Sequence, residues 1–157
     1  LHSFPTRRSS DLLQPVDDSL DVRGLDLRVY VFVQPPRTDK STRWVEGLSE
    51  QGGDIGVVQV DLAEDTVDLA LLTSVHELFH LLGATDTYDE NGFPVLPEGL
   101  AEPNREPRFP QTRFEIMARL VPQTATTGIV PTRISQLVVG QSTARGIGWI
   151  KSESPVE

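Results

Sequence analysis

The sequence predicts a single domain of the α+β class. Two segments, Leu25–Val33 and Ile55–Leu62, are rich in β-branched and aromatic side chains and have the length of buried strands. Between the second strand and Leu82 lies an apolar segment with the length and composition of a buried helix. The chain has 157 residues, which is enough to bury one core but too short for two ordinary domains.

The two ends of the chain carry little information about the fold. Residues 1–12 resemble the in-frame translation of a common short-read sequencing adapter, and we expect native sequence to begin near Leu13, with the domain truncated upstream. Residues 13–24 are polar and turn-like, which is typical of a linker or of the edge of a lost element. We expect the domain to occupy residues 13–150 and to be followed by a flexible tail over residues 151–157.

The elements before the long helix are predicted in order. Leu25–Val33 is the first buried strand. Ser41–Gln51 then predicts a short helix that ends at Gly52 and Gly53, and Ile55–Leu62 predicts the second strand. The side chains that the short helix would turn inward are Trp44, Val45 and Leu48.

The second half of the chain combines one long helix with an irregular region. The long helix is predicted to begin at Asp65 or Thr66 and to end near Leu82. Residues 87–112 contain five prolines, so we expect an ordered loop without a long helix. Ile134–Ile147 has helical spacing and predicts the final helix.

Composition excludes several classes of partner. The net charge of −9 argues against nucleic acid, which is bound by clustered Lys and Arg. No run of about 20 apolar residues is present, so the visible part does not span a membrane. The absence of cysteine excludes disulfides and thiolate ligands. The absence of cysteine does not determine the cellular compartment. We favour a secreted, periplasmic or membrane-anchored protein, and we expect it to be a monomer.

The long helix carries the pattern His-Glu-x-x-His-x-x-Gly-x-x-Asp. His76 and His80 are four residues apart, so they share one helix face and can reach a single zinc ion at about 2.0–2.1 Å. Gly83 allows the left-handed turn that returns Asp86 to the metal. Glu77 follows the first ligand, where its carboxylate can take a proton from a zinc-activated water molecule. Three protein ligands and one open position describe a catalytic zinc.

Two arrangements compete for the third ligand. In the first, a glutamate is supplied from a second helix downstream, and the candidates are Glu98, Glu102, Glu106 and Glu115. The first three lie among the prolines, where no regular helix can present them. In the second arrangement the ligand is Asp86, six residues after the second histidine. We prefer Asp86, because a short oxygen ligand just past a glycine turn satisfies zinc geometry.

The run from His76 to Tyr88 resembles the active-site stretch of metzincin-like zincin metallopeptidases whose third ligand is Asp, of the snapalysin and immune-inhibitor-A type. Phe114–Ala118 is similar to the Met-turn of this group, in which Met117 would form an apolar floor beneath the metal. The alternative is that this methionine is an ordinary core residue. The chain departs from the wider group in having Arg119 where some families keep a tyrosine.

The resemblance implies a zincin fold. It would comprise a twisted mixed β-sheet, an active-site helix, and a C-terminal subdomain with the Met-turn and a final helix. It also implies that Ile55–Leu62 is the edge strand, which would bind an extended peptide by main-chain pairing.

These features predict a zinc-dependent metalloendopeptidase that acts on peptides or proteins, holds one catalytic Zn²⁺ and uses Glu77 as general base. Tyr88 is a candidate to stabilise the transition state, although a buried tyrosine bonded to backbone explains it equally well. The turn at Asp89–Gly92 offers oxygen ligands to Ca²⁺, but we favour a solvated turn. Three alternatives stay open: an inactive zinc-bearing interaction module, a structural zinc closed by Glu102 or Glu115, and a zinc hydrolase of another amide or ester.

Overall fold

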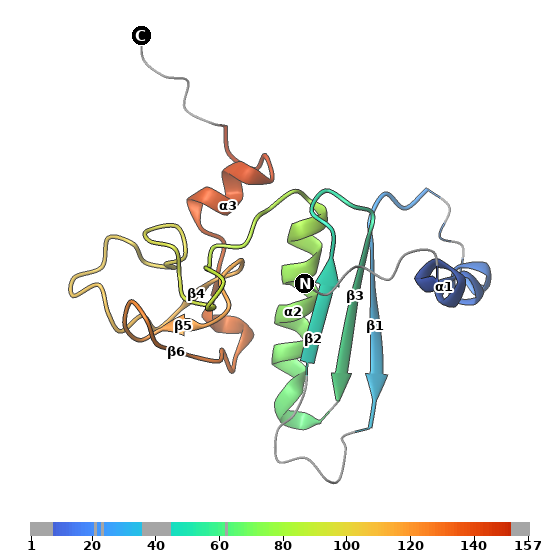
Figure 1. Ribbon diagram of the computed structural model, residues 1–157, viewed down its shortest axis with the longest axis horizontal. Coiled ribbons are helices and arrows are strands. Elements are labelled where there is room, and N and C mark those ends of the chain that lie inside the picture. Colours follow the sequence, from blue (N-terminus) through green and yellow to red (C-terminus); the bar gives the residue numbers. More distant parts are fainter. Residues whose placement is uncertain (1–7, 21, 23, 36–44, 62, 152–157) are drawn as a thin grey trace.

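The computed structural model describes residues 8–20, 22, 24–35, 45–61 and 63–151, with only the backbone described for residues 8–12 (Figure 1). It is a small mixed α+β fold. A three-stranded sheet packs on one long helix, and a region of loops, short strands and a short helix follows. The expected tail lies outside the described residues apart from Lys151. No helix in the described part of the chain is both long enough and apolar enough to cross a bilayer.

The sheet contains β1 (Arg28–Gln34), β2 (Val45–Ser49) and β3 (Ile55–Asp61) in the order β1-β3-β2. β1 pairs with β3 in parallel, and β2 pairs with β3 antiparallel, so the sheet is mixed as predicted. The expectation that Ile55–Leu62 forms the edge strand is wrong, because β3 is the central strand. The edge strands are β1 and β2. The strand order follows from the pairing of both with β3.

The predicted helix over Ser41–Gln51 is also wrong where the structure describes it. Val45–Ser49 is strand β2, and the earlier part of the predicted helix lies outside the described residues. Pairing with β3 satisfies the backbone of this segment. Gly47 disfavours a helix. Its missing side chain also leaves room for the side chain of Glu77, which comes from the long helix packed on this strand.

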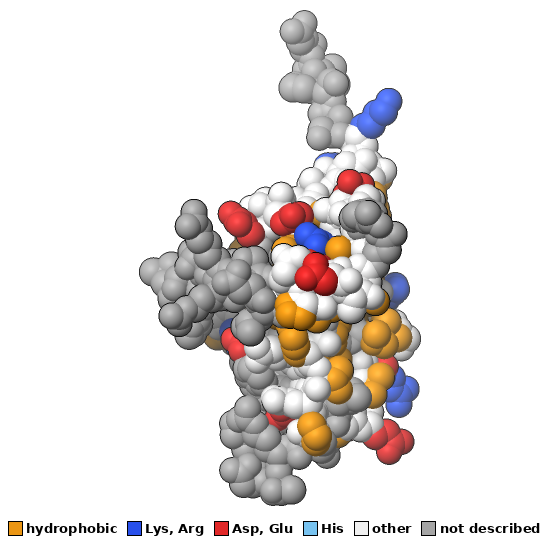
Figure 2. Space-filling view, turned by 90° about the vertical axis from the view of Figure 1, so that its right-hand side faces the viewer, with side chains coloured by type: hydrophobic (Ala, Val, Ile, Leu, Met, Phe, Trp, Pro, Cys, Tyr) orange, Lys and Arg blue, Asp and Glu red, His pale blue; other side chains and the backbone are white. Residues whose placement is uncertain are grey.

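Two further expectations about the N-terminal half need correction. Part of the segment predicted as a linker lies in helix α1 (Arg8–Ser19), where Leu13 is buried and Asp17 pairs with Arg28 at 3.0 Å. The strand predicted as buried is instead an edge strand of the described sheet, and part of it is exposed. Hydrophobic side chains are exposed on this side of the molecule (Figure 2), and those of β1 are Val31, Phe32 and Val33.

The long helix is confirmed. A 3-10 turn, η1 (Glu64–Thr66), leads into α2 (Val67–Leu81), which runs along the sheet (Figure 1). Its inward side chains pack against β2 and β3. Gly83, with a φ of 100°, ends the helix, and the next amide, of Ala84, donates to the carbonyl of Phe79 at 2.9 Å.

The C-terminal region is irregular, as the prolines predict. Its elements are β4 (Phe114–Glu115), β5 (Val121–Pro122), β6 (Gly128–Ile129), η2 (Ile134–Gln136), β7 (Leu137–Val138) and α3 (Gln141–Gly146). A continuous helix over Ile134–Ile147 is not formed. β7 pairs in parallel with β4, and Gly140, in an extended conformation, precedes a helix of only six residues.

One core cluster joins the long helix to this region. It consists of Phe79, Ala84, Ile116 and Met117, and the partly buried apolar side chains around it are Val75 of α2, Leu137 of β7, Val139 and Ile147. The C-terminal region is therefore packed against the end of α2 that carries the histidines.

Candidate metal centre

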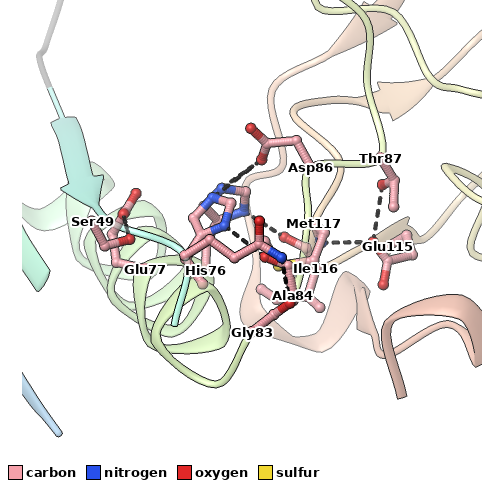
Figure 3. Close-up of polar contacts among 12 residues, drawn as sticks. Ser49, His76, Glu77, Gly83, Ala84, Asp86, Thr87, Glu115, Ile116 and Met117 are labelled. Carbon is pink, nitrogen blue, oxygen red and sulfur yellow. Dashed lines mark hydrogen bonds and ion pairs between the residues drawn. The ribbon is translucent and has the colours of Figure 1, made fainter. Parts of the chain in front are cut away.

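Three potential metal ligands converge at the C-terminal end of α2. Among the residues that the structure describes, His76, His80 and Asp86 are the one group of three His, Asp or Glu whose ligand atoms all lie within 4.8 Å of one another. Oδ1 of Asp86 is 3.3 Å from Nε2 of His76 and 3.2 Å from Nε2 of His80 (Figure 3). Two ligand atoms each about 2.0–2.1 Å from a tetrahedral zinc lie about 3.3 Å apart, so these separations fit zinc.

The turn after α2 brings the third ligand into place. The left-handed Gly83 reverses the chain, and Asp86 then faces the two imidazole rings (Figure 3). The loop before β3 holds this turn from the other side, because the side-chain amide of Gln51 donates to the Gly83 carbonyl at 2.8 Å. The sequence spacing thus produces the predicted juxtaposition through local geometry.

Backbone carbonyls fix the orientation of both imidazoles. Nδ1 of His76 lies 2.8 Å from the carbonyl oxygen of Ile116, and Nδ1 of His80 lies 3.0 Å from that of Ala84. A carbonyl oxygen only accepts, so each Nδ1 carries the hydrogen. In a neutral ring Nε2 is then an acceptor. Two Nε2 lone pairs and the Asp86 carboxylate thus face one point, which is the arrangement that a bound cation satisfies.

The pKa values of His80 and Asp86 are shifted because these groups lie so close together. Burial opposes protonation of His80, but hydrogen bonds to Asp86 and the Ala84 carbonyl, with nearby negative charge, outweigh it and raise the pKa of His80. Burial alone would raise the pKa of Asp86. In the metal-free site, however, a protonated His76 or His80 ring donates from Nε2 to Asp86, and these hydrogen bonds and the positive charge of the rings hold that pKa well below its usual range. Asp86 is therefore ionised at neutral pH.

Glu77 lies beside the ligands without joining them. Its side chain is buried, and its Oε2 accepts a hydrogen bond from the hydroxyl of Ser49 in β2 (Figure 3). The carboxylate also packs on Gly47, where an added Cβ would overlap Oε1 of Glu77. Edge strand β2 thus holds the carboxylate next to the metal centre. Sequence reasoning missed both β2 residues, although a glycine inside a strand signals close approach of another group.

Tyr88 lies two residues after Asp86 and is partly buried. Burial first, and then the negative charge and hydrogen bonding of Asp86, raise the pKa of Tyr88 to about 12, while the positive charge of Arg119 opposes the shift. The hydroxyl therefore keeps its proton at neutral pH and is a donor close to Asp86. The Arg119 side chain lies against Gly92, which is in the turn that follows Tyr88.

Met117 is fully buried in the cluster that includes Phe79 and Ala84. Its carbonyl oxygen accepts from the amide of Thr87 at 2.9 Å, directly after the third ligand. The segment that resembles a Met-turn therefore contacts the residue after Asp86 and also His76, because the Ile116 carbonyl accepts the hydrogen bond from Nδ1 of His76.

The four downstream glutamates lie outside this cluster, so among the described residues Asp86 alone occupies the position predicted for the third ligand. The cluster of ligand atoms contains none of Glu98, Glu102, Glu106 and Glu115. Glu115 is fully buried and accepts hydrogen bonds at both carboxylate oxygens, which also removes it as a fourth ligand.

The acidic turn at Asp89–Gly92 uses its first carboxylate internally. Oδ1 of Asp89 accepts from the amides of Asn91 at 2.9 Å and Phe93 at 3.0 Å. The hydrogen bond from the Phe93 amide is the main cause that lowers the pKa of Asp89. These contacts account for the turn by backbone hydrogen bonding.

Comparison of the chain with family models, with curated proteins and with solved structures finds no match. The arguments about function therefore rest on the geometry and chemistry of these residues.

Proposed function

We propose that this protein is a zinc-dependent metalloendopeptidase of the metzincin-like zincin group. The observation that carries the proposal is the convergence of three acceptor atoms, from His76, His80 and Asp86, with both Nδ1 atoms tied to backbone carbonyls. Neutral nitrogen and carboxylate ligands in a set of three are typical of catalytic zinc, which keeps a fourth position open.

Zinc at this position would act as a Lewis acid that makes water a stronger nucleophile at neutral pH. Glu77 would accept the proton that water gives up. One of its oxygens is bonded to Ser49, and among the described residues no group donates to Oε1. The same carboxylic acid would then pass the proton to the leaving amine.

The surroundings of the site favour an extended peptide as substrate. β2 is an edge strand beside Glu77, and its outer edge pairs with no described strand. Such an edge offers free amide and carbonyl groups to a peptide that pairs as an added strand. Tyr88, protonated at neutral pH, would donate a hydrogen bond to the carbonyl oxygen under attack.

The test compares cleavage of an unstructured protein by the zinc-loaded chain and by Glu77→Ala. We expect cleavage by the parent and a loss of about 10²–10⁴-fold in the variant, because that is the usual contribution of a general base. Glu64→Ala, which removes an exposed glutamate from η1, is the matched control and should keep full activity.

Each other outcome has a definite meaning. Zinc binding by parent and Glu77→Ala without cleavage by either would support a zinc-bearing interaction module instead. Cleavage of small amides or esters, but not of proteins, would support a different hydrolase. Equal cleavage by parent and variant would remove Glu77 as the base.

A further inference from the structure

A second buried carboxylate lies behind the metal centre. Glu115, in β4, is fully buried and accepts four hydrogen bonds. Oε1 accepts from the hydroxyl of Thr143 at 2.6 Å and the amide of Gly140 at 3.1 Å. Oε2 accepts from the amide of Met117 at 2.6 Å and the hydroxyl of Thr87 at 3.2 Å (Figure 3).

The surroundings of Glu115 require a carboxylate. All four neighbours donate in this arrangement, and in the part of the chain that the structure describes no Lys, Arg or His pairs with Glu115. Backbone amides cannot become acceptors, so a carboxylate is satisfied here by hydrogen bonds alone. The space is also closed, because a Cβ on Gly140 would stand 2.9 Å from Cγ of Glu115.

The partners of Glu115 lead directly to two metal ligands. The next residue, Ile116, accepts the Nδ1 hydrogen bond of His76. Thr87 follows Asp86, donates its hydroxyl to Glu115 and donates its amide to the carbonyl of Met117. The Glu115 carboxylate therefore fixes two segments relative to each other. One contains the Ile116 carbonyl, which orients His76, and the other contains Thr87, which follows Asp86.

We infer that Glu115 is a positioning residue that sets the metal affinity of the site by holding these two segments together. The inference rests on the proposed metal site and gives Glu115 a role that is distinct from ligation. Glu115→Gln would place an NH₂ group against amides and hydroxyls that already donate. The amide of Gly140 or of Met117 would lose its acceptor, and the segment carrying it would move.

The test measures the zinc dissociation constant of the full chain by competition with a chromophoric chelator. Co²⁺ absorption spectra and urea unfolding of the metal-free proteins are recorded alongside. We expect Glu115→Gln to weaken zinc binding by about tenfold or more, the lower end of what partners behind metal ligands contribute. The Co²⁺ bands of tetrahedral coordination should also weaken in this variant.

Two further variants separate positioning from general stability. Thr143→Val removes one donor to Glu115 without touching any segment that carries a ligand, and Thr143→Ser restores the hydroxyl. We expect weaker zinc binding in the first and parental binding in the second. Asp61→Asn is the matched control, because Asp61 is also buried but bonds to Gln34 in the sheet. It should leave the zinc dissociation constant unchanged even where unfolding shifts.

The outcomes distinguish this inference from the proposed function. Parental zinc binding by both Glu115→Gln and Thr143→Val would overturn the positioning role and leave the metal site standing. Equal weakening by Asp61→Asn would also overturn it, because the effect would then follow stability. A parent chain that binds no zinc would overturn the proposed function and this inference together. If Glu115→Gln does not fold, the Thr143 pair decides.

Discussion

The hydroxyl of Ser49 donates a hydrogen bond to Glu77, and this contact ties the edge of the sheet to the residue that follows the first candidate metal ligand. Ser49 and Glu77 are 28 residues apart, so the sheet must pair correctly before the carboxylate is held. A strand that would bind substrate is thereby connected to the group that would move the proton.

Gly47→Ala tests the space that Glu77 occupies. The new methyl group would overlap the end of the glutamate side chain, which can rotate away without unfolding the strand. We expect a loss of about tenfold or more in kcat, part of the 10²–10⁴-fold contribution of a general base, with unchanged zinc content. Gly146→Ala, where the added Cβ meets nothing within 4 Å, is the control. Full activity in Gly47→Ala would show that the observed position of Glu77 is unimportant.

Asp86→Ala should reduce zinc affinity by more than the about 10- to 100-fold that partners behind the ligands contribute, since it removes a direct ligand. His80→Ala should have a similar effect. Glu98→Ala, an exposed glutamate in the proline-rich loop, should bind zinc like the parent. Chelator competition measures all three constants, and a loss confined to Glu98→Ala would reverse the ligand assignment.

Zinc removal should lower the thermal stability of the chain. Free zinc at 100 times its dissociation constant stabilises the folded state by about 2.7 kcal/mol. For a chain of this size that corresponds to a rise in Tm of about 5–11 °C. Differential scanning calorimetry with and without chelator measures the shift, and Mg²⁺ at the same concentration should produce none. An unchanged Tm after zinc addition would contradict a folded-state site.

The metal-free chain should lose stability as the pH rises through the pKa of His80. That pKa is raised above 6.5 on folding, so the His80 contribution is fully present below pH 6.5 and is lost above the folded value. The lowered pKa of Asp86 adds stability that is present above pH 3.8 and disappears only at lower pH. Urea midpoints at pH 5.5 and 8.5 test this.

Asp86→Asn provides the comparison for the pH experiment. Removal of the charge should reduce the difference between the two midpoints, because His80 loses its main anionic partner. Saturating zinc should also reverse the trend in the parent, since the metal requires an unprotonated ring. A pH response that is the same in parent and variant would assign it to other groups.

Met117→Ala should destabilise the protein by about 2–5 kcal/mol, because the side chain is fully buried among Phe79, Ala84 and Ile116. Met117→Leu should cost less than about 1.5 kcal/mol and keep zinc affinity within about twofold. Denaturant unfolding and chelator competition measure the two effects. A large loss of zinc affinity in the leucine variant alone would show that the sulfur matters beyond packing.

The arrangement of the three candidate metal ligands could be predicted because it is a local property. His76 and His80 share one helix face, and Asp86 returns within a single turn, so spacing alone determines the cluster. The Met117 segment was found through its resemblance to a known turn, and its burial agrees with either interpretation of that residue.

The features that depend on distant pairing could not be predicted. β2 was interpreted as a helix and β3 as an edge strand, because neither segment shows in its own sequence which strand lies beside it. Glu115 was considered only as a ligand, since its partners Thr87 and Thr143 each lie 28 residues away. Pairing and burial across such separations overrode local preference.

The hydrogen bond from His76 to the carbonyl of Ile116 spans 40 residues of chain, which constrains the order of folding. Closing so long a loop costs entropy that is repaid only when the C-terminal segment packs on the helix. A nascent chain that has not yet reached Ile116 carries both histidines with one ring free to rotate. We therefore expect metal uptake by the proposed site to be a late step, which would complete a folded domain and would not nucleate it.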